Sequence, residues 1–214
     1  MNLKKQEIIE IINTLNTTYP DTKCSLDFTT PFELVVAVML SAQCTDERVN
    51  KTTPTIFKDY KTPEDFANID ISVLEKLIHP CGFYKSKSKN IIACAKKIVS
   101  DFNGCVPDTM NELLTLPGIG RKSANVILLE VFGIAIGVAV DTHAKRLANR
   151  IGFSNETAPE KIEMDLIELI PNEYLKDVNH LFMYHGRNIC TARNPKCNSC
   201  PIYKYCKNPC INTK

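Results

Sequence analysis

The sequence lacks tryptophan, an apolar run long enough to cross a membrane, and a strong excess of either charge. Its most apolar helical stretch, Leu34 to Leu40, is far shorter than the roughly 20 residues that span a bilayer. The first seven residues, MNLKKQE, carry charges where a secretory signal needs an apolar core. We therefore expect a cytoplasmic protein with no membrane partner. A length of 214 residues allows one large domain or two small ones.

The net charge of +2 is too small to predict nucleic-acid binding, but the charges are unevenly spread. Residues 83–100 contain five lysines and residues 187–214 contain six basic side chains, and neither segment has an acid. Residues 156–177 reverse the balance, with seven acids against two lysines. Such a two-signed surface suits a protein that lays one face on a polyanion. It equally suits helices whose solvated faces merely differ in charge.

Strand signals are scarce: only residues 134–140 have a β-like composition, which Gly137 weakens. Thr30-Pro31-Phe32-Glu33, in contrast, combines a capping box with proline at the first helical position. The helix that follows, residues 32–41, is apolar on all sides and is expected to be buried. Further helix starts are predicted at Thr62, Ser72, Thr109, Asp141 and Pro159, and further helices near residues 3–16, 84–103 and 173–187. We predict an all-α fold.

Ten cysteines are many for a protein without a secretory signal, because a reducing compartment disfavours disulfides. Four of them, Cys190, Cys197, Cys200 and Cys206, have the spacing C-x6-C-x2-C-x5-C, which is typical of a zinc or iron–sulfur site. The spacing does not separate these two metals, and Cys210 lies close enough in sequence to replace the last ligand. The remaining cysteines are expected to be small buried hydrophobic residues: Cys24, Cys44, Cys81, Cys94 and Cys105.

A glycine-rich turn, Pro117 to Gly120, lies between two apolar helical patterns in LTLPGIGRKSANVILLEVFGIAIGVAVDTHAKR, residues 114–146. Glycine lets a ligand approach the main chain closely, and free N–H groups at a helix start bind anions. The turn is therefore a plausible grip on a phosphate, with Lys122 as a phosphate contact or as a more reactive amine. An ordinary helix–helix turn with a surface lysine fits the spacing equally well.

Three segments, LPGIGRKSANV, AVDTHAKR and HGRNICTARNPKCNSCPIYKYC, resemble the endonuclease III family of DNA glycosylases and abasic-site lyases. Ser41-Ala42-Gln43 and residues 82–87 also fit this family, and the likeness extends from about residue 28 to 206. It implies a six-helix barrel domain with a helix–hairpin–helix motif at residues 23–134. Residues 1–22 and 135–214 would form a second domain with a [4Fe-4S] cluster on Cys190, Cys197, Cys200 and Cys206. The implied partner is double-stranded DNA, bound by a monomer in the cleft between the two domains.

The resemblance also implies catalytic roles. Lys122 would attack C1′ of the damaged nucleotide and form a Schiff base, from which β-elimination breaks the strand. Asp141 would stabilise positive charge on the sugar or handle protons, and the family pattern does not choose between these roles. A simple helix cap remains the alternative for Asp141. His143 would line the pocket, although a histidine packed at a helix start fits as well.

Further residues are implied as DNA contacts. Gln43 would fill the space that the everted nucleotide leaves, and Phe83, where many relatives have leucine, would wedge into the opposite strand. Gly118 and Gly120 would present backbone N–H groups to phosphate. The candidate phosphate contacts among the cations are Lys85, Lys87, Arg121, Lys145, Arg187 and Arg193.

These roles predict a base-excision-repair enzyme that removes oxidised pyrimidines from duplex DNA and cleaves the strand at the resulting abasic site. It would act in the cytoplasm, associated with the nucleoid when bound to DNA. One alternative is a thymine or uracil mismatch glycosylase of the same superfamily. Another is a non-catalytic DNA-binding module that uses the cluster as a redox sensor, but the presence of both Lys122 and Asp141 argues against it.

Overall fold

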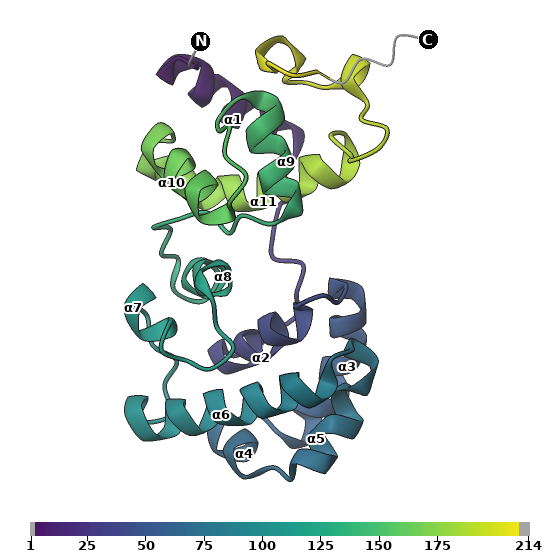
Figure 1. Ribbon diagram of the computed structural model, residues 1–214, viewed down its shortest axis with the longest axis vertical. Coiled ribbons are helices and arrows are strands. Elements are labelled where there is room, and N and C mark those ends of the chain that lie inside the picture. The colour runs from purple at the N-terminus through teal and green to yellow at the C-terminus, as the bar shows by residue number, and fades with distance from the viewer. Residues whose placement is uncertain (1–2, 210–214) are drawn as a thin grey trace. The chain divides into compact units, whose positions relative to one another are not determined.

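A computed structural model describes residues 3–209, and within them every regular element is a helix (Figure 1). The predicted all-α fold is confirmed, and residues 134–140 form no strand. The chain divides into two compact units: Cys24–Gly133, here called the hairpin unit, and Met1–Lys23 with Ile134–Lys214, here called the cysteine unit. Within residues 3–209, no helix is both long enough and apolar enough to cross a membrane.

The hairpin unit is built around α2 (Pro31–Ser41), which packs against α3, α6 and α8. Thr30 and Glu33 form the predicted capping box, and Pro31 occupies the first turn. The helix is buried on all sides, as its composition predicts. The other helical elements of this unit are α3 (Asp46–Asp59), α4 (Pro63–Asn68), α5 (Ile71–Ile78), the 3₁₀ turn η1 (His79–Cys81), α6 (Tyr84–Phe102), α7 (Met110–Leu113) and α8 (Arg121–Phe132).

Two details of the hairpin unit differ from the sequence-based expectation. Helix α3 was not anticipated, because it contains Pro54 and has a polar composition, although Thr45 caps it and Ile56 anchors its apolar face. Helix α5 begins at Ile71, one residue before the expected Ser72. The reason is that Asp70 caps it by accepting a hydrogen bond from the Ser72 N–H at 2.7 Å.

The cysteine unit has its own apolar core. Its longest helix, α11 (Asn172–Asn188), packs against α1 (Lys5–Thr18) and α9 (Thr142–Ile151), and α10 (Pro159–Leu169) packs against α9. The core combines residues from all four helices, including Ile11, Leu147, Leu166 and Phe182. Between α11 and residue 209 the regular elements are two 3₁₀ turns, η2 (Cys197–Ser199) and η3 (Tyr203–Tyr205).

The cysteines outside the C-terminal four are not uniformly buried. Cys81 and Cys94 are buried, as expected, whereas Cys24 and Cys44 are half-buried. Cys105 is exposed, so the expectation was wrong there, because this residue lies in the surface turn that follows α6. Cys210, the alternative ligand, lies outside the described residues.

Candidate functional site

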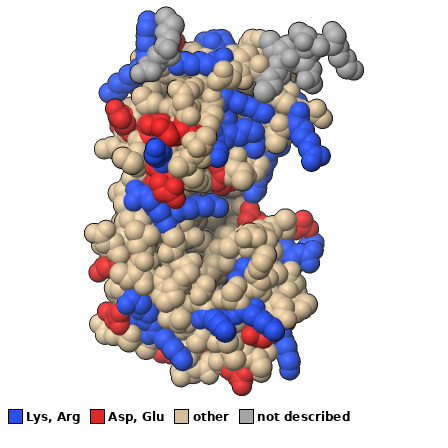
Figure 2. All heavy atoms as spheres, viewed as in Figure 1, with Lys and Arg blue, Asp and Glu red and all other residues tan. Residues whose placement is uncertain are grey.

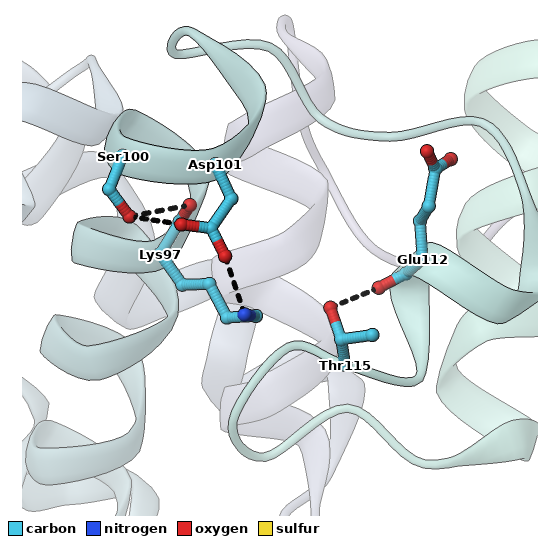
Figure 3. A network of polar contacts seen from close by, with 5 residues as sticks. All are labelled: Lys97, Ser100, Asp101, Glu112 and Thr115. Atoms are coloured by element: carbon cyan, nitrogen blue, oxygen red, sulfur yellow. Dashed lines mark hydrogen bonds and ion pairs between the residues drawn. The ribbon is translucent and has the colours of Figure 1, made fainter.

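Local hydrogen bonds build the turn between α7 and α8. The Thr115 hydroxyl donates to the Glu112 carbonyl at 2.7 Å, which closes the end of α7 (Figure 3). The Ile119 N–H then donates to the Leu116 carbonyl at 3.1 Å, and both of these side chains are buried. The turn between α7 and α8 is therefore a defined hairpin whose apolar side chains anchor it in the unit. The ion pair of Lys97 with Asp101, at 2.6 Å on the last turns of α6, is local to that helix (Figure 3).

The two glycines of the hairpin differ in what requires them. Gly118 has a φ of +81°, and a Cβ there would lie 2.7 Å from Cε of Met39 and 3.0 Å from Cβ of Asn90. Both its backbone conformation and its packing against α2 and α6 exclude a side chain. Gly120 has a φ of −101°, and a Cβ there would meet nothing within 4 Å. Neither strain nor crowding requires glycine at position 120, so the space beside it is open to a ligand.

Helix α8 begins directly after this open glycine. No side chain caps its N-terminus, so its first N–H groups have the orientation and partial positive charge that attract an anion. Arg121 and Lys122 occupy its first two positions, and both side chains are exposed. The hairpin thus combines an open approach to the backbone, a helix N-terminus and an accessible amine.

Gln43 and Phe83 share an uncommon backbone conformation. Their φ values are +53° and +47°, in the left-handed region that non-glycine residues rarely adopt. Such strain costs on the order of 1–3 kcal/mol for each residue and is typical of functional positions. Phe83 is 64% exposed, so its ring does not belong to the apolar core, and Gln43 is exposed as well.

The candidate phosphate contacts differ in their placement. Lys87 is the exception to the expectation: its side chain is buried, and its Nζ donates to the Leu40 and Cys81 carbonyls at 2.8 Å each. It is therefore turned away from any ligand at the surface. Lys145 donates to the Thr157 carbonyl at 2.7 Å. Four candidates have exposed side chains: Lys85, Arg121, Arg187 and Arg193.

Surface charge gives no further guide to these cations. Figure 2 shows basic and acidic side chains on the same visible face, with uncharged surface between them. This agrees with the small net charge of +2. The prediction of DNA binding therefore depends on individual cationic residues and not on the total charge.

Asp141 caps α9 in the predicted way. Its Oδ1 accepts hydrogen bonds from the His143 N–H at 2.8 Å and the Ala144 N–H at 2.7 Å. Within residues 3–209 no donor reaches Oδ2, and the side chain is half-buried. One carboxylate oxygen therefore holds the helix start, while the other remains available for chemistry.

His143 is packed within the cysteine unit. Its Nδ1 lies 3.0 Å from Nη2 of Arg146, and a Cβ on Gly186 would be only 2.8 Å from the same ring atom. The ring thus lies against α11 and is held by Arg146. Arg146 also donates to the Gly186 carbonyl at 2.9 Å and to the Cys190 carbonyl at 2.8 Å. No sequence motif marks this arginine, which fixes the backbone of Cys190.

The four C-terminal cysteines line one pocket that opens to solvent. Arg150, His185 and Ile202 also line it. Across residues 3–209, no three His, Cys, Asp or Glu side chains surround a point that can hold a single metal ion. A single zinc ion needs its sulfur ligands at about 2.3 Å. Four thiols around one pocket are a donor set that zinc and iron–sulfur centres share.

Hydrogen-bond donors accompany two of these sulfur atoms. Arg150 Nη1 lies 3.4 Å from Sγ of Cys190, and His185 Nε2 lies 3.5 Å from Sγ of Cys200. Burial lowers the pKa of His185 to about 4, so its imidazole is neutral near pH 7. A thiolate that ligates iron has no proton to donate, so at such a sulfur Nε2–H of the ring is the donor and Nδ1 accepts from the Tyr19 hydroxyl at 3.1 Å. These donors suit thiolates that ligate iron.

The fold and the two motifs define a class of DNA repair protein. Residues 36–172 match the family model described as HhH-GPD superfamily base excision DNA repair protein. Residues 190–206, which begin at Cys190 and end at Cys206, match the iron–sulfur binding domain of endonuclease III.

Similar proteins identify the family within this class. Endonuclease III of Synechocystis sp. is 49% identical over 206 residues, which cover 96% of this chain and 94% of the relative. Two solved structures, a non-covalent endonuclease III–DNA complex and a trapped endonuclease III–DNA covalent intermediate, match with TM-scores of 0.89 and 0.90. Each is 39% identical, with 96% of both chains covered. The chain belongs to the endonuclease III family, and its cofactor is a [4Fe-4S] cluster.

Proposed function

We propose that this protein is a base-excision-repair DNA glycosylase that removes oxidised pyrimidines from duplex DNA and cleaves the abasic strand by β-elimination. The single observation that carries this proposal is the exposed Lys122 at the uncapped start of α8, directly after the open Gly120. This arrangement offers a phosphate site and an amine within one turn of helix. The family membership established above supports the same activity.

The hairpin binds the DNA backbone. A phosphate oxygen accepts hydrogen bonds from N–H groups at the start of α8, where the helix dipole favours negative charge. Gly120 permits this approach because nothing occupies the space where its side chain would be. Contacts of this kind hold DNA without reading its sequence, which suits an enzyme that must find damage in any context.

Reaching C1′ requires that the damaged nucleotide leave the base stack, which costs a few kcal/mol. Gln43 and Phe83 offset this by entering the duplex as the nucleotide leaves. Both are exposed and held in strained conformations, and the exposed Phe83 ring presents an apolar surface that can replace lost stacking.

The chemistry begins when the neutral amine of Lys122 attacks C1′. The Nζ–C1′ bond forms as the glycosidic bond breaks, and the base departs with the bonding electrons and takes up a proton. One proton then passes from the amine to O4′ as the C1′–O4′ bond of the sugar ring breaks, which leaves a protonated Schiff base between Lys122 and C1′. This imine makes the C2′ proton acidic, and its removal expels the 3′ phosphate in β-elimination. Asp141 Oδ2 stabilises positive charge on the sugar or accepts one of these protons.

Cys190, Cys197, Cys200 and Cys206 hold the [4Fe-4S] cluster, which when bound fixes the C-terminal loop. Arg193 lies in this loop and Arg187 lies in α11 just before it, so ordering the loop allows both side chains to contact phosphate. His143 lies at the start of α9, two residues after Asp141, and borders the nucleotide pocket. The proposed place of action is the cytoplasm, in association with the nucleoid when the protein is bound to DNA.

Borohydride trapping tests this function directly, because it reduces a Schiff base to a stable protein–DNA bond. The protein is incubated with duplexes that contain thymine glycol, an abasic site or a G·T mismatch. Trapping is expected with the first two. Trapping with only the mismatch would reassign the protein as a mismatch glycosylase, and binding without any trapping would leave a DNA-binding module.

A further inference from the structure

Lys87 is a buried cation that the proposed mechanism does not use. Only 6% of the residue is exposed, and its Nζ donates hydrogen bonds to two carbonyl oxygens, Leu40 O and Cys81 O, both at 2.8 Å. The acceptors belong to segments that are 41 residues apart in the sequence, by subtraction of their numbers. One side chain on α6 therefore joins two separate stretches of backbone.

Both stretches lead directly to strained residues. Leu40 lies in the last turn of α2, three positions before Gln43, and Cys81 ends η1, two positions before Phe83. Apart from Asn103, which ends α6, these are the non-glycine residues with positive φ among residues 3–209. The Lys87 ammonium group thus binds the backbone shortly before each of the two strained residues.

The local hydrogen bonds explain why a cation is needed there. The Cys44 N–H, which would bond to Leu40 O in a continuing helix, donates instead to the Ser41 carbonyl at 3.0 Å. The Leu40 carbonyl is therefore one of the acceptors that a helix end leaves over, at the negative pole of the helix dipole. A charged donor satisfies such a group strongly, and a neutral apolar side chain leaves it unpaired.

The groups around the ammonium favour this positional role. The half-buried thiol of Cys44 and the buried thiol of Cys81 lie near Nζ, and no carboxylate within residues 3–209 forms an ion pair with it. Burial lowers the pKa of Lys87 from its ordinary value. Its hydrogen-bond partners are thus main-chain oxygens, so the position of its ammonium group is tied to the position of the backbone.

We propose that Lys87 is a positioning residue that holds Gln43 and Phe83 in the geometry needed to enter the duplex during nucleotide eversion. The proposal rests on the proposed function, since it assigns a cause to one step of it. Lys87 does not touch DNA. It acts by fixing two backbone segments relative to each other within the hairpin unit.

A specific consequence follows for the choice of substrate. Gln43 and Phe83 are needed only where a nucleotide must be displaced from a stacked duplex. An abasic site in single-stranded DNA has no opposite strand and no vacated space to fill. Reaction with single-stranded abasic DNA therefore depends on Lys122 but is independent of Lys87.

The test compares Schiff-base trapping rates of wild type and Lys87→Met on the same abasic oligonucleotide, single-stranded and in duplex. Methionine retains an unbranched stem and loses both hydrogen bonds. A displacement of about 1 Å can lower a rate by about 100-fold, so we expect a loss of about 10- to 100-fold on the duplex. The single-strand rate should stay within about threefold of wild type. Lys96→Met, at an exposed position of α6, is the matched control and should leave both rates unchanged.

A second measurement separates positioning from loss of fold. In a Gln43→Ala/Phe83→Ala background, Lys87→Met should cost little further duplex activity, because its effect passes through those two residues. Equal losses on both substrates, or full additivity with the double variant, would overturn the proposal. If Lys87→Met does not fold, Lys87→Arg gives the same readout with a smaller duplex loss. Failure of wild type to trap either substrate would instead reject the proposed function.

Discussion

The two units of this protein obtain their functional geometry in different ways. In the hairpin unit, steric fit dominates: α2 is buried on all sides, and Gly118 is pressed against Met39 and Asn90. In the C-terminal part of the cysteine unit, polar donors dominate: Arg146 and Arg150 hold backbone carbonyls between residues 186 and 192, and four thiols line one pocket.

The two units should therefore be destabilised by different kinds of substitution. A packed unit is sensitive to changes in side-chain volume, because its interior has almost no free space. A segment that is held by donors and metal is sensitive to the loss of a single ligand or hydrogen bond, whereas its exposed positions tolerate substitution. Four predictions test the contrast.

The largest effect is expected at an exposed position of the hairpin unit, where packing plays no part. Lys122→Gln should abolish borohydride trapping, because an amide cannot form a Schiff base. Its affinity for abasic duplex should remain within a few-fold of wild type, and its stability within about 0.5 kcal/mol, since the side chain is exposed. Trapping assays and fluorescence anisotropy measure the two properties. Undiminished trapping would exclude Lys122 as the nucleophile.

The next effect concerns the metal ligands. Cys206→Ser should lose iron and the visible absorbance of the cluster, and hydrogen exchange should rise from Cys190 onward while α2 stays protected. Cys105→Ser, at an exposed thiol, is the control and should keep full iron content. Cys210→Ser should also keep its iron. Zinc in place of iron in the purified protein, or iron loss only in Cys210→Ser, would contradict the ligand assignment.

Asp141 allows its two carboxylate oxygens to be tested separately. Asn caps a helix nearly as well as Asp, so Asp141→Asn should keep the stability of α9 within about 0.5 kcal/mol while base release slows about 100-fold. Asp141→Ala should show the same slow step and lose a further ~1 kcal/mol of stability with the cap. Thermal unfolding and single-turnover kinetics distinguish these losses. Normal base release by the asparagine variant would reduce Asp141 to a cap.

The smallest effects come from the two hairpin glycines, which form a matched pair. Gly118→Ala should destabilise the protein by about 1–3 kcal/mol, because its φ of +81° and its crowded surroundings both exclude a methyl group. Gly120→Ala should unfold like wild type but bind DNA more weakly, since the new methyl group occupies the open approach to phosphate. If both variants lost only stability, the hairpin would have no role in binding.

The sequence predicted those features that depend on neighbouring residues. The caps at Thr30, Thr62 and Asp141 are local, since each bonds to an N–H two or three positions away. Helix α3 was not predicted, because its apolar face is short and Pro54 interrupts the helical pattern. The assignment of Lys122, Asp141 and the four C-terminal cysteines depended on motifs. The catalytic roles of Lys122 and Asp141 and the ligand roles of the cysteines remain predictions.

Other features depended on the fold and were beyond a reading of the sequence. Lys87 reads as one of several surface lysines, and only the packing of α6 against α2 reveals that it is buried. Arg146 bonds to carbonyls more than 35 residues away, and no local pattern predicts this. The positive φ of Phe83 was equally invisible, because phenylalanine is not a residue that usually marks such a turn.

The division of the chain has a consequence for folding during synthesis. All of the hairpin unit is contiguous, so it can collapse as soon as Gly133 has left the ribosome. Helix α1, in contrast, is made first but must wait for α11, whose residues cover its apolar side. Until then Ile8, Ile11, Ile12 and Leu15 remain uncovered on a nascent helix. A pause in translation after residue 133 would prolong that exposure, and it is then that a chaperone would be most useful to this protein.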